Sequence, residues 1–302
     1  MKIEKFAIIQ GNCSIENGII KYLEAAKNED GKQVRNSTAI IRSSFSFSNG
    51  IICFNVKVTD AKSSFFLVLQ TADGREIYIG YNRYVDAFII RYADDTKNEK
   101  LLDSAGNLSN YQKGEWIDIK IKVFGSLISL LANDIIMCTA NVTLKDRPVE
   151  IKVSGQHELS IKDVTIDKEQ RKVFVVMQFT QEYNDLYNEV ILPTIEKFDM
   201  QCIRADDIYS STPILLDIIS ELSTASIVIA DITPDNPNVF YELGYAHAIK
   251  KPTIILAEKQ RTKLPFDLSG FRTIFYDNSI AGKRKVETTL RKYIEKITNL
   301  TS

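Results

Sequence analysis

The sequence predicts two domains: an all-β antiparallel sandwich over residues 1–168, and an α/β domain over residues 171–302 with a parallel sheet and helices on both faces. Three observations predict this division. The chain has 302 residues, whereas one domain usually needs roughly 100 to 200. Apolar residues recur with a period of two in the first half. The second half instead alternates short apolar runs with stretches of helical period.

The first half has the pattern of strands with one buried face. Segments 52–58 and 117–123 alternate apolar and polar residues at every step. Turn-forming pairs separate other apolar runs, and the pairs are Asp73-Gly74 and Asn133-Asp134. Many short strands joined by tight hairpins, with no long helical pattern, favour an antiparallel sandwich.

The second half repeats a strand and then a helix. The expected strands are 172–179, 200–205, 225–231, 252–258 and 271–277, and the expected helices are 182–198, 212–224, 238–251 and a final charged helix. Pro193 is expected to bend or divide the first of these helices. A regular β-α alternation favours a parallel sheet with helices on both faces, here a flavodoxin-like arrangement.

The composition excludes several classes of function. Lys and Arg number 38 against 39 acidic residues, so no excess positive charge favours nucleic acid as the partner. No stretch approaches about 18 consecutive apolar residues, and the first apolar run is too short for a signal peptide, so we expect a cytoplasmic protein without a membrane segment. The cysteines are isolated from one another, which favours reduced thiols and no metal site: Cys13, Cys53, Cys138 and Cys202.

Polar and apolar side chains gather where the predicted parallel strands end. In such sheets ligands bind beyond the carboxyl ends of the strands. Met177, Gln178 and Phe179 follow the first strand, and Asp231 ends the third. At the end of the second strand stand Arg204, Asp206 and Asp207. We therefore expect these residues to line one crevice. The sequence contains neither a GxGxxG dinucleotide fingerprint nor a GxxxxGK[ST] phosphate loop.

Glu242 stands out on the third helix of this half. Asn236 followed by Pro237 has the pattern of a helix N-cap with proline at the first helical position. From that start, Glu242 shares one helix face with three apolar residues, Val239, Leu243 and Ala246. A carboxylate buried in an apolar stripe is costly, which favours a functional role. The alternative is a hydrated carboxylate near the positive helix terminus.

The neighbours of Glu242 support several interpretations. Phe240 and Tyr241 are suited to stack on a base, and equally to pack in the core or at an interface. Gly244 is expected to permit close helix packing. His247 lies between two alanines, which favours a packing role over a substrate contact.

The second half also resembles a known group of enzymes. The segments FVVMQF, CIRADD and IVIADITPDNPNVFYELGYAHAIKKPTIIL, within about residues 172–276, are similar to nucleoside 2-deoxyribosyltransferases and to bacterial TIR-like domains. The resemblance implies that Glu242, the glutamate of the ELG motif, is the catalytic carboxylate that acts on the sugar. It implies further that Asp231 and Asn238 hold the base or ribose, and that Asn236 lies near the position of a base-contacting aspartate.

The first half resembles the laminin-G or concanavalin-like jelly-roll sandwiches. The segment GEWIDIKIKVFGSLISLLANDIIMC carries this likeness, supported by the closing strand LSIKDVTI. The resemblance implies a glycan or protein ligand for the sandwich.

Together the two resemblances imply an effector that hydrolyses the N-glycosidic bond of NAD or a related nucleotide, in bacterial anti-phage or stress defence. The sandwich would be its sensor or scaffold, and the chain would form a homo-oligomer. No metal or cofactor is required, since the nucleotide is the substrate or ligand. Two alternatives stay open, a non-catalytic nucleotide-binding signalling module and a nucleoside 2-deoxyribosyltransferase.

Overall fold

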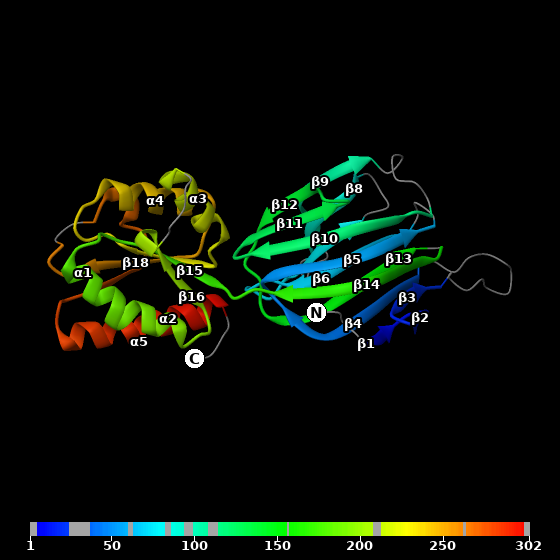
Figure 1. Ribbon diagram of the computed structural model, residues 1–302, viewed down its shortest axis with the longest axis horizontal. Coiled ribbons are helices and arrows are strands. Elements are labelled where there is room, and N and C mark those ends of the chain that lie inside the picture. The colour runs from blue at the N-terminus through cyan, green and yellow to red at the C-terminus, as the bar shows by residue number, and fades with distance from the viewer. Residues whose placement is uncertain are drawn as a thin grey trace. The chain divides into compact units, whose positions relative to one another are not determined.

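A computed structural model describes residues 5–23, 37–59, 63–81, 86–93, 99–107, 114–155, 157–207, 213–261 and 264–298. The chain divides into two compact units. The first comprises residues 1–123 and 127–169, and the second comprises residues 124–126 and 170–302. Figure 1 shows both units with their element labels.

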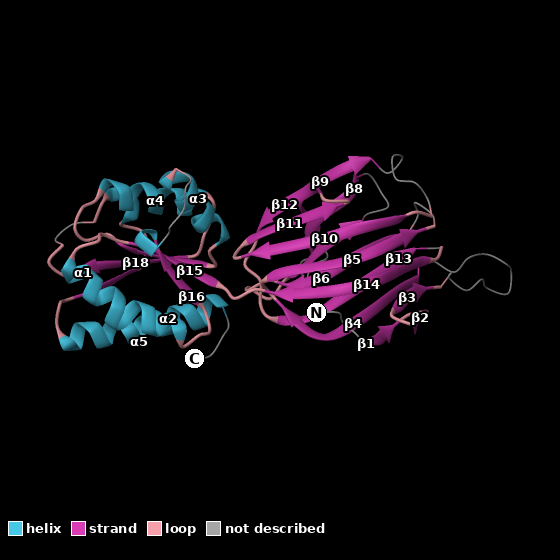
Figure 2. Ribbon diagram, in the orientation of Figure 1, coloured by secondary structure: helices cyan, strands magenta, loops and turns pink. Residues whose placement is uncertain are grey.

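The first unit is built from two seven-stranded antiparallel sheets (Figure 2). One sheet has, from edge to edge, β1 (Phe6–Gln10), β4 (Ser37–Phe47), β13 (Arg147–Gly155), β6 (Ser64–Gln70), β7 (Glu76–Tyr81), β8 (Asp86–Ala93) and β9 (Glu99–Asn107). The other has β12 (Ile135–Asn141), β11 (Leu127–Ala132), β10 (Trp116–Phe124), β5 (Gly50–Val58), β14 (Leu159–Lys168), β3 (Ile19–Tyr22) and β2 (Cys13–Glu16).

A single apolar core lies between these two sheets. Alternate residues of β5 and β10 point into it, so the period-two pattern of the sequence becomes one buried face on each strand. Asn133 and Asp134 both have positive φ angles, 49° and 63°, as the tight turn between β11 and β12 requires. The predicted antiparallel sandwich of the jelly-roll kind is confirmed.

The second unit has a five-stranded parallel sheet. Its order is β16 (Gln201–Arg204), β15 (Lys172–Val176), β17 (Ile227–Asp231), β18 (Thr253–Glu258) and β19 (Thr273–Tyr276). In chain order this is 2-1-3-4-5, the flavodoxin-like arrangement. All five residues of β17 are buried, as expected for a central strand covered on both faces.

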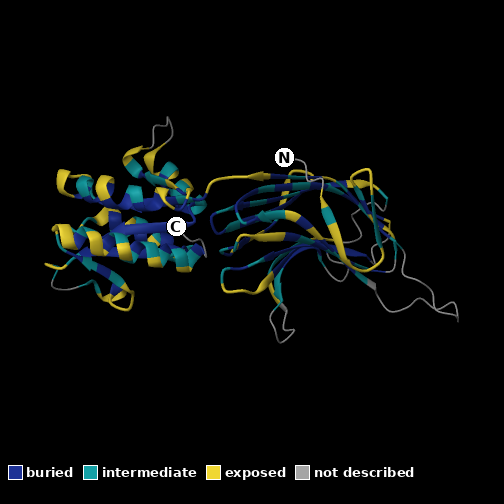
Figure 3. Ribbon diagram, turned by 90° about the horizontal axis from the view of Figure 1, so that it is seen from below, coloured by how far each residue is buried: buried dark blue, intermediate teal, exposed yellow. Residues whose placement is uncertain are grey.

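Helices cover both faces of this sheet, which confirms the predicted α/β class. Figure 1 shows α3 (Ile214–Thr224) and α4 (Pro237–Ala248) on one face. On the other face lie α1 (Gln181–Leu186), α2 (Leu192–Glu196) and α5 (Ile280–Thr298). Each helix buries one side and exposes the other (Figure 3), and a separate apolar cluster fills each face.

Pro193 divides the first predicted helix. The backbone between α1 and α2 forms a π-helical segment at Tyr187–Ile191. Proline has no N–H to donate to the carbonyl four residues earlier, so the ordinary helical ladder cannot continue through it. The sequence prediction of a bend or division at this proline is confirmed.

No helix in the described part of the chain is long and apolar enough to cross a membrane. The four cysteines are free thiols. Burial raises the pKa of the Cys13 thiol to about 11.

The interpretation of Gly244 as a close-packing residue was wrong. Gly244 is exposed on α4, and a Cβ atom built there has no described atom within 4 Å. Gly282 in α5 is the opposite case, because its Cβ would lie 2.0 Å from the Asp277 carbonyl oxygen.

We therefore expect Gly244→Ala to stabilise the protein by about 0.5–1 kcal/mol, because alanine loses less backbone entropy in a helix. Gly282→Ala should destabilise it, since the backbone must move to relieve the clash. Urea denaturation followed by helical circular dichroism measures both changes. A loss of stability in Gly244→Ala would restore the packing interpretation.

Candidate functional site

A cavity of about 660 Å³ opens at the carboxyl ends of β15 and β16. The volume lies within the roughly 300–1,000 Å³ of small-molecule sites. In the 2-1-3-4-5 order, the connections that leave the first and third strands lead to opposite faces of the sheet, which creates a crevice at this point. The cavity is lined by Val175, Val176, Met177, Gln178, Phe179, Ala205, Asp206, Ile214, Leu215, Asp217, Ile218, Asn236, Asn238, Val239, Tyr241 and Glu242.

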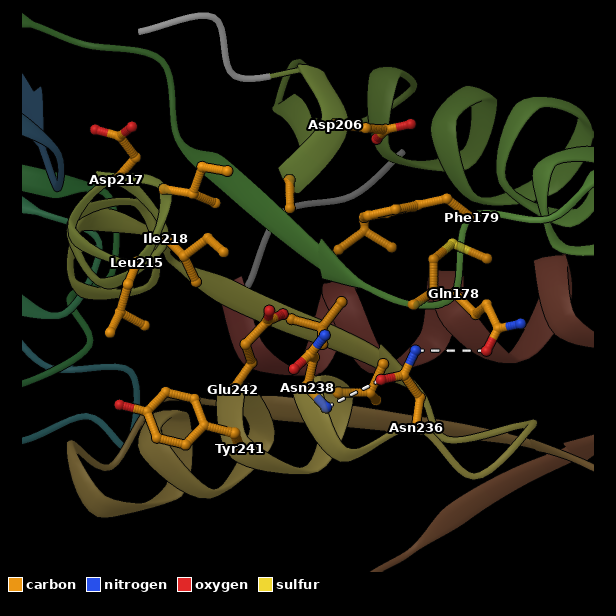
Figure 4. A pocket seen from close by; sticks show the side chains of 16 residues that line it. Gln178, Phe179, Asp206, Leu215, Asp217, Ile218, Asn236, Asn238, Tyr241 and Glu242 are labelled. Atoms are coloured by element: carbon orange, nitrogen blue, oxygen red, sulfur yellow. Dashed lines mark hydrogen bonds between the residues drawn. The ribbon is translucent and has the colours of Figure 1, made fainter. Parts of the chain in front are cut away.

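The start of α4 determines where Glu242 lies. The Asn236 side chain caps the helix by accepting a hydrogen bond of 2.9 Å from the Asn238 amide, as predicted. Counting from that cap, Val239, Leu243 and Ala246 are buried against the sheet. Glu242 falls at the edge of this buried stripe, and its carboxylate points into the cavity (Figure 4).

The Glu242 carboxylate has an unusual environment. It is partly buried, and it makes no hydrogen bond or ion pair with another described residue. Burial raises its pKa to about 7. Near neutral pH the side chain therefore exchanges between a proton donor and an unpaired anion, as acid-base and nucleophilic catalysis require.

Amide side chains form a second part of the wall. Asn236 donates from Nδ2 to Oε1 of Gln178 at 3.4 Å, which connects α4 to the segment that follows β15. Asn238 also lines the cavity. An amide offers both a donor and an acceptor, so these groups suit the hydroxyls and ring nitrogens of a nucleoside.

Asp206 is held from behind by Arg204. The guanidinium of Arg204 donates two hydrogen bonds of 2.5 Å, one to each oxygen of the Asp206 carboxylate. A third, of 2.8 Å, goes to Asn184. Only 8% of the Arg204 side chain is exposed, whereas Asp206 is 36% exposed and faces the cavity.

Aromatic and apolar side chains complete the cavity. Met177 is buried at its base. Phe179 and Tyr241 are 48% and 55% exposed, so each presents a ring surface to solvent and to the cavity. Eight of the residues proposed from the sequence therefore lie together.

Asp231 was also expected in the crevice, but it lies outside the cavity lining. Its carboxylate accepts hydrogen bonds from the Tyr276 hydroxyl at 2.5 Å and from the Thr233 amide at 3.1 Å. It is 1% exposed, and burial raises its pKa to about 7 although both hydrogen bonds act in the opposite direction. These contacts anchor the first residues of the connection from β17 to α4.

Sequence reasoning missed the contribution of α3. Ile214, Leu215, Asp217 and Ile218 line the cavity from the amino-terminal half of α3. An apolar run at the start of a helix is a general feature of packing, and it carries no specific signal for a cavity. Arg204 and Asp207 were expected at this crevice, but neither is among its described lining residues. Arg204 instead holds Asp206, two residues later, and Asp207 accepts a hydrogen bond from the Arg204 amide.

His247 takes the packing role that the sequence favoured. Its ring stacks on Phe271 with the ring centroids 4.3 Å apart, and its Nε2 is hydrogen-bonded to the Thr253 hydroxyl at 3.0 Å. It does not line the cavity. Phe240 packs against the apolar cluster under α3 and α4.

The charge of the cavity is one-sided. Asp206, Asp217 and Glu242 line it, and no Lys or Arg is among its described lining residues. The described residues also contain no group of three His, Cys, Asp or Glu placed to hold a metal ion. A neutral or cationic group is therefore favoured inside the cavity over a phosphate.

We expect Glu242→Gln to stabilise the protein above neutral pH. The pKa of Glu242 is about 7 in the folded chain and 4.5 in the unfolded chain. Below pH 4.5 the group is protonated in both states, and the full stability of the fold is present. This stability is lost as the pH rises through about 7, because the folded state disfavours the ionised form. At about pH 8 the glutamine variant should be more stable by about 1–2 kcal/mol, after allowance for the solvent screening of a partly exposed group. At about pH 4 the two chains should be equally stable.

Urea denaturation followed by helical circular dichroism tests this, since all described helices of at least one full turn lie in the second unit. If the difference in stability between the two chains is the same at both pH values, the pKa of Glu242 is not raised by folding and the carboxylate is hydrated.

Comparison with known proteins does not assign a family. No family model and no curated protein matches the chain. Solved structures match its N-terminal half. The carbohydrate-binding module CBM66 from Bacillus subtilis is 9% identical, with 54% of this chain and 95% of that chain covered and a TM-score of 0.41. A β-glucanase from Bacillus licheniformis is 12% identical, with coverages of 54% and 92% and a TM-score of 0.39. A lichenase from a mouse hindgut metagenome is 12% identical, with coverages of 52% and 84% and a TM-score of 0.39.

Proposed function

We propose that the second unit cleaves the N-glycosidic bond of NAD or a related nucleotide, with Glu242 as the catalytic carboxylate. One observation carries this proposal. A single partly buried carboxylate, without a hydrogen-bonding partner among the described residues, points into a ligand-sized cavity at the switch point of a parallel sheet. The resemblance around the ELG motif supports the same assignment.

Cleavage of an N-glycosidic bond needs one such carboxylate. As the bond between the anomeric carbon and the base nitrogen breaks, its electron pair leaves with the base and positive charge develops on the sugar. An ionised Glu242 would stabilise this charge, or would bond to the anomeric carbon until water replaces it. The cavity is lined largely by apolar side chains, Val239 and Ile218 among them, and electrostatic interactions are stronger in apolar surroundings than in water.

The charge of the cavity supports a particular placement of the substrate. The carboxylates of Asp217 and Glu242 disfavour a phosphate inside, whereas Arg204 compensates the charge of Asp206. The nucleoside portion would therefore occupy the cavity and the phosphates would extend toward solvent. The amides of Gln178, Asn236 and Asn238 suit the polar edges of a nucleoside, and Tyr241 offers a ring to stack on. In the wider proposal that the resemblance implies, this unit acts in bacterial defence and the sandwich is its sensor.

We expect purified protein to release nicotinamide from NAD, or free base from a deoxynucleoside, and chromatography of the products distinguishes the two. Glu242→Gln should reduce the rate at least about 1,000-fold, because the amide cannot stabilise or trap the cationic sugar. Glu196→Gln is the matched control, since this exposed glutamate of α2 lies outside the cavity. Binding of nucleotide without turnover would favour the signalling module.

The rate should also depend on pH through Glu242. Its ionised form is the active one, so kcat/KM should rise with pH through a single ionisation with a midpoint near the pKa of about 7. A steady-state profile between about pH 5 and pH 9 measures this. A flat profile would contradict the role of Glu242.

A further inference from the structure

Arg204, Asp206 and Phe179 form a second functional group in the cavity, on the side away from Glu242. Arg204 ends β16, and Asp206 follows it in a short 3₁₀ turn at Ala205–Asp207. Phe179 arrives from the segment after β15. Figure 4 shows Asp206 and Glu242 well separated within one cavity, on different elements.

The guanidinium of Arg204 is fixed on every side. Besides its hydrogen bonds to Asp206 and Asn184, it lies 4.3 Å from the centre of the Tyr187 ring and 5.2 Å from that of Phe179. Contacts between a guanidinium and an aromatic face are attractive. One buried cation therefore orients both a carboxylate and an aromatic ring that line the cavity.

The position of Asp206 is determined more narrowly than that of an ordinary surface aspartate. Asp207, the next residue, accepts a 3.1 Å hydrogen bond from the Arg204 amide and a 3.2 Å one from the Tyr187 hydroxyl. These bonds hold the 3₁₀ turn, and the two-point contact with Arg204 then sets the plane of the Asp206 carboxylate. Each carboxylate oxygen has further acceptor capacity for a donor in the cavity.

We propose that Asp206 determines specificity by accepting hydrogen bonds from the N–H edge of a nucleobase that stacks against Phe179, and that Arg204 is its positioning residue. This inference rests on the proposed function only in taking the ligand to be a nucleoside unit. If Glu242 meets the sugar, the distant Asp206 meets the far end of the ligand. The Asp206 carboxylate has only acceptor oxygens, so it offers a phosphate no hydrogen bond, whereas an exocyclic amine or a ring N–H can donate to it.

Binding is measured by calorimetry in the Glu242→Gln background, so that no turnover interferes. The ligands are adenosine, guanosine, cytidine and purine riboside, the last of which has no N–H on its base. At least one of the first three should bind about 10- to 100-fold more tightly than purine riboside, the difference that a hydrogen bond to a charged group makes.

Adding Asp206→Asn or Arg204→Lys should reduce that discrimination to a few-fold, because the first removes the charge and the second removes the planar fork. Asp217→Asn is the matched control, since it removes one negative charge from the same cavity. It should change the affinities for all four ligands alike. A purely structural role of Arg204 would weaken all four ligands equally and leave the ratio intact.

Equal affinities for the four nucleosides, or no binding of any of them, would overturn the inference without requiring a variant to fold. The outcome is independent of catalysis. Discrimination that depends on Asp206 in a protein with no turnover would reject the proposed function and retain this inference. Turnover that depends on Glu242, without discrimination that depends on Asp206, would support the proposed function and reject this inference.

Discussion

The position at which α4 begins is the constraint on which the site depends. Once the Asn236 side chain caps the helix, each later residue is rotated by a fixed angle. Val239 and Leu243 then pack on the sheet, and Glu242 is carried to the border between the core and the cavity. A start one residue earlier or later would turn this carboxylate either into the apolar layer or out to solvent.

The connection before that cap is tied to the sheet by hydrogen bonds. Asp231 holds the Thr233 amide, and the Thr233 hydroxyl accepts a 3.0 Å hydrogen bond from the Glu258 amide. Arg261 donates to the Ile232 carbonyl oxygen at 2.6 Å. Asp231 thus belongs to the scaffold that delivers α4 to its position, and its influence on the cavity is indirect.

The sequence predicted the architecture because the patterns involved are local and repeated. Alternation, β-α order and the Asn236-Pro237 cap each depend on a few neighbouring residues. The predictions that were wrong concern residues whose surroundings depend on contacts between distant segments. Gly244 could not be distinguished from a packing glycine without knowing that its side of α4 is open. Asp231 ends its strand as predicted, but only the fold shows that the Tyr276 hydroxyl, from β19, occupies its carboxylate.

The two carboxylates of the site differ in what surrounds them, and this difference separates their tasks. Asp206 is paired with a buried guanidinium, so its charge is compensated and its geometry is fixed, as recognition requires. Glu242 has no such partner among the described residues, and desolvation leaves its anionic form less stable than in water. An anion in that state gains more than a compensated one when positive charge develops beside it. The same burial that costs folding stability at Glu242 therefore makes it, and not Asp206, the residue suited to act on the sugar.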